Sequence, residues 1–262
     1  MQIRVLGCSG GICRGMATTS ILLDKDILID AGTGVADLTL AEMRAIRHVF
    51  LSHSHLDHIA SIPLLADSIF DSLIANPITV HALPETIDAL QKHVFNSVVW
   101  PDFTMLPNEA DAVISLQAMQ PGATTVIAGR SIEMIAVNHA VPAVGYRVDS
   151  DGGSFAFSGD TTTNGGLWQV LNGHADLDLL FIESAFTNRD IALARSARHY
   201  CAELLAADLA GLQHQPTICI SHLHPGEEAT IMRECREAMP GRELRQLRGG
   251  DVFQLGKKGS EQ

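Results

Sequence analysis

Short apolar runs recur along the chain and predict two series of buried strands, each followed by helices. In the first half, runs bounded by glycines or charged turns predict strands at 3–6, 20–23, 27–30 and 48–51. A helix-like stretch runs up to Met43. Amphipathic spacing then predicts helices over 61–74 and 84–99, with a short strand at 78–81 between them.

The second half of the chain repeats this pattern. Polar turns separate apolar runs that predict strands at 124–128, 131–137, 145–148, 154–157, 177–182, 217–221 and 251–255. Helical spacing covers 200–212 and 227–239. The order of strands and helices predicts two sheets packed face to face between outer helices. Residues 100–111 are irregular over a length that favours a lid or a substrate wall.

A cluster of histidines and one aspartate follows the predicted strand 48–51 directly. His53, His55, Asp57 and His58 lie within six residues. Imidazole and carboxylate suit zinc, iron or manganese, and four such groups exceed what one ion usually takes from so short a loop. His53 and His55 point the same way in an extended loop, whereas Asp57 and His58 lie beyond a bend. We therefore expect two metal ions side by side; the alternative is a solvated, histidine-rich loop.

Three further ligand-type residues stand at the ends of predicted strands in the second half. His139 follows the run 131–137, Asp160 follows 154–157, and His222 follows 217–221. Layered α/β folds gather their ligands on loops beyond strand ends. Taken singly, a histidine is more often structural and an aspartate after glycine is more often part of a turn.

Length and charge narrow the class of protein. The 262 residues suffice for a substantial core, and we expect residues 1–262 to form one domain. A formal net charge of −12 argues against a protein that binds long nucleic acid by neutralising phosphates. A small anionic substrate is compatible with that charge, because two divalent ions create a local positive centre.

The cysteines and the apolar runs indicate the compartment. Five cysteines without a C-x-x-C pair favour a reduced, cytoplasmic setting. We expect no secretion signal and no membrane span, since no window approaches eighteen apolar residues. We expect the tail from Gly256 to Gln262 to be frayed.

The motif His-x-His-x-Asp-His at 53–58, with His139, Asp160 and His222 in the same chain order, resembles the ligand set of the metallo-β-lactamase superfamily. The resemblance extends from Ile29 to Asp251 and implies a four-layer αββα sandwich. It also implies two divalent ions, with zinc as the first choice and manganese or iron as alternatives. One metal would take His53, His55 and His139, and the other Asp57, His58 and His222, with Asp160 bridging both.

A narrower resemblance points to class II 3′,5′-cyclic nucleotide phosphodiesterases. The stretch 53–59, with its leucine inside the motif, is similar to that family's signature, as are Trp-Pro-Asp-Phe at 100–103 and Glu-Ser-Ala-Phe at 183–186. Two stretches depart from the family. Ser-Ala-Arg-His at 196–199 stands where the family has Ser-Gly-His, and His-Leu-His-Pro at 222–225 where it has His-Leu-Lys-Pro.

This resemblance implies hydrolysis of a 3′,5′-cyclic nucleotide such as cyclic AMP. Two divalent ions roughly 3.5–4 Å apart can hold a bridging hydroxide that attacks phosphorus. Asp57 and Asp160 would orient this nucleophile, and His199 would protonate the departing 3′-oxygen. The alternative for His199 is a neighbour of a helix start that faces solvent.

Four residues are candidates for substrate binding. His224 would contact phosphate, support His222 or simply lie on the surface. Trp100, Phe103 and Phe186 would wall an apolar slot for a purine, since aromatic faces stack on bases. Ordinary core packing is the alternative for these three aromatic residues.

Other functions compete with this interpretation. A ribonuclease Z-like endonuclease that processes transfer RNA shares the seven ligands and a histidine like His199, but such enzymes grip RNA with a basic or glycine-rich arm that we do not find between His139 and His222. A hydrolase of another small ester and a non-catalytic metal-binding sensor are further alternatives. Redox relatives carry glutamate at the position of His55. We expect a small-molecule phosphodiester as partner, no long nucleic acid, no membrane, and a homodimer as the default assembly.

Overall fold

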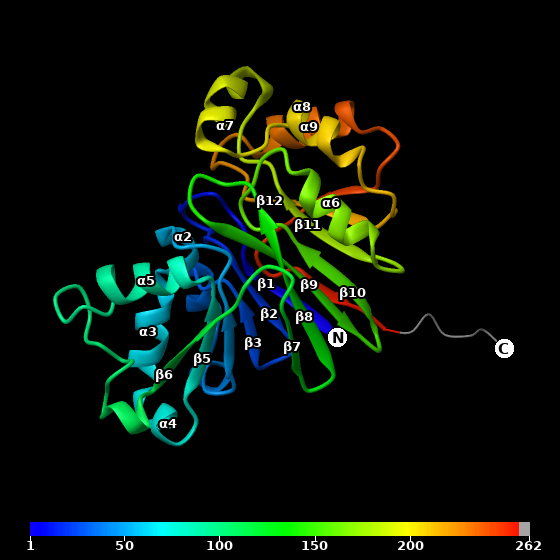
Figure 1. Ribbon diagram of the computed structural model, residues 1–262. Helices are drawn as coiled ribbons and strands as arrows, with labels where there is room; N and C mark the ends of the chain where they lie inside the picture. The colour runs from blue at the N-terminus through cyan, green and yellow to red at the C-terminus, as the bar shows by residue number, and fades with distance from the viewer. Residues whose placement is uncertain (257–262) are drawn as a thin grey trace.

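A computed structural model describes residues 1–256, which form two mixed sheets of seven strands packed face to face between helices (Figure 1). The strand order is β14-β1-β2-β3-β4-β5-β6 in the first sheet and β13-β12-β11-β10-β9-β8-β7 in the second. This is the predicted αββα sandwich. The tail that we expect to be frayed, 256–262, lies outside the described residues from 257 onward.

The first sheet combines an antiparallel half with a parallel half. Strands β14, β1, β2 and β3 pair antiparallel, and β3, β4, β5 and β6 pair parallel. Its strands are β1 (Gln2–Gly7), β2 (Ser20–Leu23), β3 (Ile27–Ile29), β4 (His48–Phe50), β5 (Ile78–Ala82), β6 (Ile114–Ala118) and β14 (Val252–Gln254).

The second sheet has the same mixed character. Strands β7 to β10 form an antiparallel meander, and β10, β11, β12 and β13 pair parallel. Its strands are β7 (Thr124–Ile127), β8 (Arg130–Val137), β9 (Ala143–Ser150), β10 (Gly153–Phe157), β11 (Leu179–Glu183), β12 (Thr217–Ser221) and β13 (Leu244–Gln246).

Helices cover the outer face of each sheet. In the first half they are α1 (Leu40–Met43), α2 (Leu56–Ile59), α3 (Ser61–Ser68), α4 (Phe70–Ala75) and α5 (Pro84–His93). In the second half they are α6 (Gly165–Asn172), α7 (Ile191–Ala197), α8 (Ala202–Leu209) and α9 (Glu228–Ala238). Short 3₁₀ turns occupy Thr33–Asp37, Glu109–Asp111 and Asn188–Asp190. Among the described helices, none is long and apolar enough to cross a membrane.

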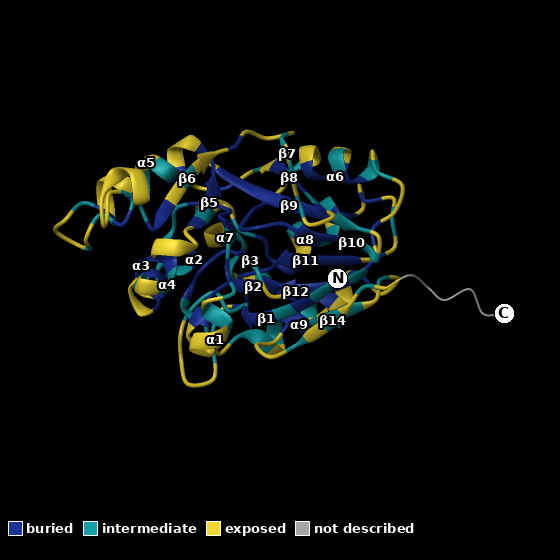
Figure 2. Ribbon diagram, turned by 90° about the horizontal axis from the view of Figure 1, so that it is seen from below, coloured by how far each residue is buried: buried dark blue, intermediate teal, exposed yellow. Residues whose placement is uncertain are grey.

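Successive side chains along each strand point to opposite faces of its sheet, and the buried ones form three apolar layers. In β3, Ile27 and Ile29 face the second sheet, whereas Leu28 faces the helices of the first. The second sheet repeats this arrangement in β11, where Phe181 packs between the sheets and Leu180 packs under helices. Buried strands consequently form the centre and exposed helical faces the outside (Figure 2). Both sheets thus bury two faces, which explains why their strands read as nearly continuous apolar runs.

Several predicted elements differ from the observed ones. The helix expected over 61–74 is interrupted at Ile69, and the helix expected over 84–99 ends at His93. Edge strands β6 and β13 were not predicted, because most of their residues are at least partly exposed and give no apolar run. Helices α6 and α7 were missed too; α6 begins with two glycines, which disfavour a helix.

Strand direction brings the candidate site residues to one edge of the sandwich. Strands β8, β10, β11 and β12 run the same way, because each of β8 and β10 is antiparallel to β9 and the others follow β10 in parallel. Their carboxyl ends therefore share one edge, where His139, Asp160, Glu183 and His222 stand. The histidine loop after β4 comes from the first sheet.

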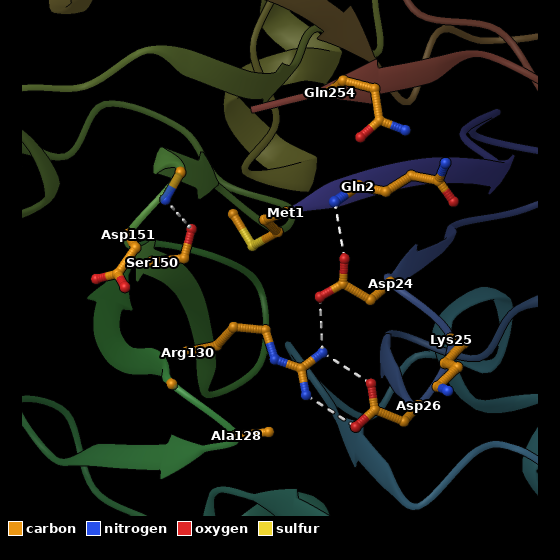
Figure 3. A pocket seen from close by; sticks show the side chains of 12 residues that line it. Met1, Gln2, Asp24, Lys25, Asp26, Ala128, Arg130, Ser150, Asp151 and Gln254 are labelled. Atoms are coloured by element: carbon orange, nitrogen blue, oxygen red, sulfur yellow. Dashed lines mark hydrogen bonds and ion pairs between the residues drawn. The ribbon is translucent and has the colours of Figure 1, made fainter. Parts of the chain in front are cut away.

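At the opposite end of the sandwich, an arginine beside a surface pocket joins the two sheets. Arg130, at the start of β8, donates through Nη1 to Asp24 (3.0 Å) and to Asp26 (2.7 Å), and through Nη2 to Asp26 (2.8 Å) (Figure 3). Its Nε donates to the carbonyl of Ile127 at 3.2 Å. Because Asp24 and Asp26 belong to the β2–β3 turn, this cluster ties the two sheets together.

Candidate metal centre

The histidine loop combines an extended stretch with one helical turn. Backbone pairing from Leu51 to His81 continues the register of β4 beyond its last residue. His55 then stands immediately before α2, whose first turn contains Asp57 and His58. The chain thus bends between His55 and Asp57, as the sequence predicts.

The loop meets three residues from the second sheet and forms two groups of potential metal ligands. The ligand atoms of each group lie within 4.8 Å of one another. The first group is His53, His55, His139 and Asp160; the second is Asp57, His58, Asp160 and His222. The structure therefore brings together all seven residues named from the sequence, with Asp160 common to both groups.

Asp160 lies at the centre of these groups. Its Oδ2 is 3.2 Å from His58 Nε2 and 3.8 Å from His53 Nε2, and its Oδ1 is 3.2 Å from His222 Nδ1. In the first group, His139 Nε2 lies 3.2 Å from His55 Nδ1. Only Asp57 and His55 are partly exposed, which leaves an opening on their side of the groups.

The residues present fit divalent cations. Three buried nitrogens, on His53, His58 and His222, have no hydrogen-bond partner within residues 1–256, although the carboxylate of Asp160 is close. These contacts lack hydrogen-bond geometry, and a buried polar atom without a partner is costly. Converging imidazole nitrogens and carboxylate oxygens are the donors that zinc, manganese and iron prefer. Divalent metal ions would satisfy these atoms together.

Outer hydrogen bonds orient the histidines. Buried Asp30 accepts from His58 Nδ1 at 2.7 Å, so the other ring nitrogen of His58 faces the site. Asp30 also accepts from the backbone N–H and the hydroxyl of Ser52, both at 2.7 Å. This role of Asp30 was missed, because its place at the end of the predicted strand 27–30 was the one signal and no spacing pattern supported it. Nearby, a Cβ on Gly32 would lie 2.1 Å from the carbonyl oxygen of Asp57, so only glycine fits there.

Burial and neighbouring charge act against each other in this cluster. Burial lowers the pKa of His53 well below its ordinary value. Burial also opposes protonation of His58, but Asp160 and Asp30 outweigh it and raise the pKa of His58. Burial disfavours ionised Asp160, yet His222 and His58 hold its pKa well below the usual range. The site is therefore built around an ionised carboxylate among imidazoles.

His199 and Glu183 form a pair beside the two groups. Glu183 is fully buried at the end of β11 and accepts from His199 Nδ1 at 2.7 Å. It also accepts from the backbone N–H groups of Thr161, Ala185 and Tyr200. Burial lowers the pKa of His199, but Glu183 outweighs it and raises that pKa to about 9. The role of Glu183 was not predicted, although it lies in a motif that the sequence singled out.

The His199 ring lies against both ligand groups. Its centroid is 4.9 Å from that of His139 and 5.3 Å from that of His222, and the rings of His199 and His222 are stacked. Because Nδ1 is engaged by Glu183, Nε2 is the nitrogen free to meet a substrate. His199 is thus part of the site rather than an isolated surface residue.

Of the aromatic residues proposed to bind substrate, one lies beside the ligand groups and the others pack in or against the core. The ring of Phe186 is 5.7 Å from His199 and stacks on exposed His224 at 6.2 Å. Phe103, in contrast, is 3% exposed and packs against Phe70 and Phe95 in the core. Its predicted place in a purine slot is therefore wrong, and the core-packing alternative holds. Trp100 packs against the same core and buries its indole N–H without a partner within the described chain.

Comparison with known families agrees with this architecture. Residues 25–239 match the family described as "Beta-lactamase superfamily domain". The chain belongs to the metallo-β-lactamase superfamily. Members of this superfamily are metal-dependent hydrolases, and the clustered histidines and aspartates are candidate ligands for divalent metal.

The chain is similar to proteins named cyclic-nucleotide phosphodiesterase and to proteins named ribonuclease Z. The chain is 36% identical over 83 residues to 3′,5′-cyclic-nucleotide phosphodiesterase 1 of Saccharomyces cerevisiae, a match covering 32% of this chain and 22% of the relative. It is 28% identical over 270 residues to a ribonuclease Z of Bradyrhizobium sp., covering 82% of this chain and 85% of the relative. A probable 3′,5′-cyclic-nucleotide phosphodiesterase of Yersinia pestis is 30% identical, over 61% of this chain and 54% of its own length.

Solved structures show the same fold at low identity. Unliganded yeast PDE1 superposes with a TM-score of 0.82 at 18% identity, covering 97% of this chain and 99% of that one. The short form of human tRNase Z gives a TM-score of 0.71 at 15% identity, covering 97% and 99% of the two chains.

Proposed function

We propose that this protein is a dinuclear metal-dependent phosphodiesterase that hydrolyses a 3′,5′-cyclic nucleotide, with cyclic AMP as the first substrate to test. One observation carries the proposal. Two groups of metal-ligand type share Asp160, and the ring of His199, hydrogen-bonded to Glu183, lies against both. This arrangement supports a role for His199 as proton donor to a phosphodiester held by the two groups.

The relatives support this substrate class in part. Both the yeast and the Yersinia relatives carry the name cyclic-nucleotide phosphodiesterase, and their matches include 30% to 36% identical residues. The matches span 22% of the yeast relative and 54% of the Yersinia relative. The histidine loop with its internal leucine supports the same assignment.

Each ligand group would hold one divalent ion. We propose zinc, with manganese or iron as alternatives, because all three accept this donor set. His53, His55 and His139 would hold one ion, Asp57, His58 and His222 the other, and Asp160 both. Bound together, the two ions would supply a hydroxide near neutral pH and offset the negative charge of a phosphoryl group.

Residues of this chain would orient the nucleophile and protonate the leaving group. Asp160 and Asp57 would orient the attacking hydroxide through their carboxylate oxygens. As the hydroxide oxygen bonds to phosphorus and the bond to the 3′-oxygen breaks, His199 would donate the Nε2 proton to that leaving oxygen. Glu183 holds Nδ1–H of the same ring and so keeps it in the donating orientation. Phe186 and His224 would border the nucleotide.

A ribonuclease Z-like activity is the second candidate. The observation that favours it is the match over 85% of the Bradyrhizobium ribonuclease Z. The net charge of −12 counts against it, because a precursor transfer RNA binds mainly through its phosphates. Hydrolysis of another small ester, or metal binding without turnover, would be the remaining outcomes of a substrate test.

A single product assay separates these functions. Protein loaded with zinc or manganese would be given cyclic AMP, bis(p-nitrophenyl) phosphate and a precursor transfer RNA. We expect turnover of the cyclic nucleotide, and its loss in Asp160→Asn but not in the exposed control Asp67→Asn. Cleavage confined to the transfer RNA would replace the proposal with the endonuclease. Metal binding with no product from any substrate would refute an enzymatic role.

A further inference from the structure

Arg198 adopts a backbone conformation that arginine rarely takes. It ends helix α7 in the left-handed region, with φ 56° and ψ 51°. Glycine is the usual residue at such a helix end, because it has no Cβ to clash. The position also lies one residue before His199, within the stretch Ser-Ala-Arg-His that departs from Ser-Gly-His. An arginine retained here needs a compensating contact.

The compensating contact is a reciprocal pair of hydrogen bonds with His139. The guanidinium Nη1 of Arg198 donates to the carbonyl oxygen of His139 at 2.7 Å. The carbonyl oxygen of Arg198 lies 3.0 Å from His139 Nδ1 and accepts its proton. The second bond leaves Nε2 of His139 facing His55 in the first ligand group. Both bonds join residues 59 positions apart.

The same turn also places His199. The backbone N–H of His199 donates to the carbonyl of Ala194 at 2.9 Å, which fixes its position directly after the left-handed residue. The Arg198 backbone therefore connects His139, in the first ligand group, to the histidine that lies over both groups.

We propose that Arg198 is a positioning residue: its guanidinium and carbonyl together hold the ring of His139 toward the first ligand group. The inference rests on the metal-binding part of the proposed function. The guanidinium bond is the part that glycine cannot supply, whereas the carbonyl bond is available to any residue in this conformation. Substitution by glycine therefore removes the contact to the His139 carbonyl and at the same time relieves the backbone.

This combination gives a test that separates positioning from folding. Arg198→Gly should leave the thermal unfolding midpoint of the metal-free protein unchanged or slightly higher, since the backbone strain is relieved. In the same variant, titration of Zn²⁺ alone against a chromophoric chelator should show one of two zinc affinities weakened a few-fold, up to about 10-fold. This is less than the roughly 10- to 100-fold seen when the partner of a ligand ring is itself lost, because the Arg198 carbonyl still accepts from His139 Nδ1. The second affinity should stay unchanged.

Two further variants act as controls. Arg198→Lys keeps the charge but offers no planar donor, so we expect an intermediate zinc affinity. Arg195→Ala removes a cation from the exposed face of the same helix and should bind zinc like the unaltered protein. Equal weakening of both zinc affinities, or no weakening in Arg198→Gly, would overturn the positioning role.

The zinc titration uses no substrate, so its result can be separated from the test of phosphodiesterase activity. If the unaltered protein binds two zinc ions with the predicted hierarchy among variants but hydrolyses no phosphodiester, the positioning role stands and the proposed activity fails. If the unaltered protein hydrolyses cyclic AMP while all variants bind zinc alike, the activity stands and the positioning role fails. An unaltered protein that binds no zinc would refute both.

Discussion

The two ends of the sandwich use buried charge in opposite ways. At the end shown in Figure 3, Arg130 is 5% exposed and its Nε, Nη1 and Nη2 all donate to oxygens of Asp24, Asp26 or Ile127. At the other end, buried nitrogens of His53, His58 and His222 converge on one carboxylate and find no hydrogen-bond partner among the described residues. The first end is complete without a ligand, and the second is not.

Electrostatics reinforces this difference. Hydrogen bonding to Asp26 raises the pKa of Arg130, and the same bond lowers the pKa of Asp26, so each group stabilises the charge of the other. At the metal end, burial opposes the charges that neighbouring groups favour. Buried polar groups that have all their hydrogen-bond partners stabilise the fold, whereas buried polar groups that converge without partners indicate a binding site. Substitutions at the two ends should therefore separate activity from folding.

The largest effect is expected at Asp160. Asp160→Asn removes the charge shared by both ligand groups, so phosphodiester turnover should fall by about a thousandfold or more, roughly 4 kcal/mol of transition-state stabilisation. Circular dichroism should show an intact fold. Steady-state kinetics at saturating zinc measures the loss, with exposed Asp67→Asn as the matched control. Retention of more than a tenth of the activity would mean that Asp160 does not serve both groups.

Next comes His199, whose contribution should depend on the leaving group. His199→Ala should slow hydrolysis of cyclic AMP about a hundredfold but that of bis(p-nitrophenyl) phosphate only a few-fold, because p-nitrophenolate leaves without a proton. The kcat values of the two substrates give the ratio. Equal slowing of both would assign His199 to binding instead of proton donation.

Arg130 should affect stability and leave activity intact. Arg130→Met leaves Asp24 and Asp26 facing each other without their cation, which should cost about 2–3 kcal/mol of unfolding free energy. This loss is below the roughly 3–5 kcal/mol of a fully buried pair, since the side chains of Asp24 and Asp26 are 38% and 24% exposed. Urea unfolding measures the loss, and kcat of the folded fraction should not change.

Two companions sharpen the Arg130 experiment. Adding Asp24→Asn and Asp26→Asn to Arg130→Met should restore most of the lost stability, because no uncompensated charge remains. Lys92→Met breaks the exposed pair with Asp88 and should change stability by less than about 0.5 kcal/mol. A loss in Lys92→Met as large as that in Arg130→Met would show that burial does not decide the cost.

The same contrast explains what the sequence could predict. Four of the seven ligand-type residues were found because they stand within six positions after a predicted strand. His139, Asp160 and His222 also follow predicted strands, but only the resemblance to the superfamily's ligand set made them ligands. Asp30 and Glu183 were missed as hydrogen-bond partners, since a single acid after a strand carries no spacing signal. Arg130 was missed for a related reason: its partners are more than a hundred residues away. Phe103 was misplaced because an aromatic residue in an irregular segment reads alike whether it faces a substrate or the core.

The smallest effect concerns a histidine between the two ends. The carbonyl of His81 accepts from the backbone N–H of Leu51, toward the metal end, and its ring nitrogen Nε2 lies 3.1 Å from Nδ1 of His48. The backbone N–H of His48 donates to the carbonyl of Asp26, at the end that holds Arg130. Its ring stacks on Phe50 at 4.3 Å, and its Nδ1 has no partner in the described chain. No carboxylate belongs to this cluster, so we expect His81 to titrate rather than to bind metal.

The direction of that titration follows from burial. Burial, with a smaller contribution from His48, lowers the pKa of His81 from 6.5 to about 4. The native state therefore takes up this proton less readily than the unfolded chain, and unfolding free energy is lost as pH falls from about 6.5 toward 4. Between pH 7.5 and 5 the loss should be about 2 kcal/mol. In His81→Gln, urea unfolding at the two pH values should show a drop smaller by that amount, while exposed His93→Gln keeps the original drop. If His81→Gln lost as much unfolding free energy between the two pH values as the unaltered protein, burial would not keep the His81 ring neutral. His81 would then carry a charge in the folded state, as the residues at the two ends do.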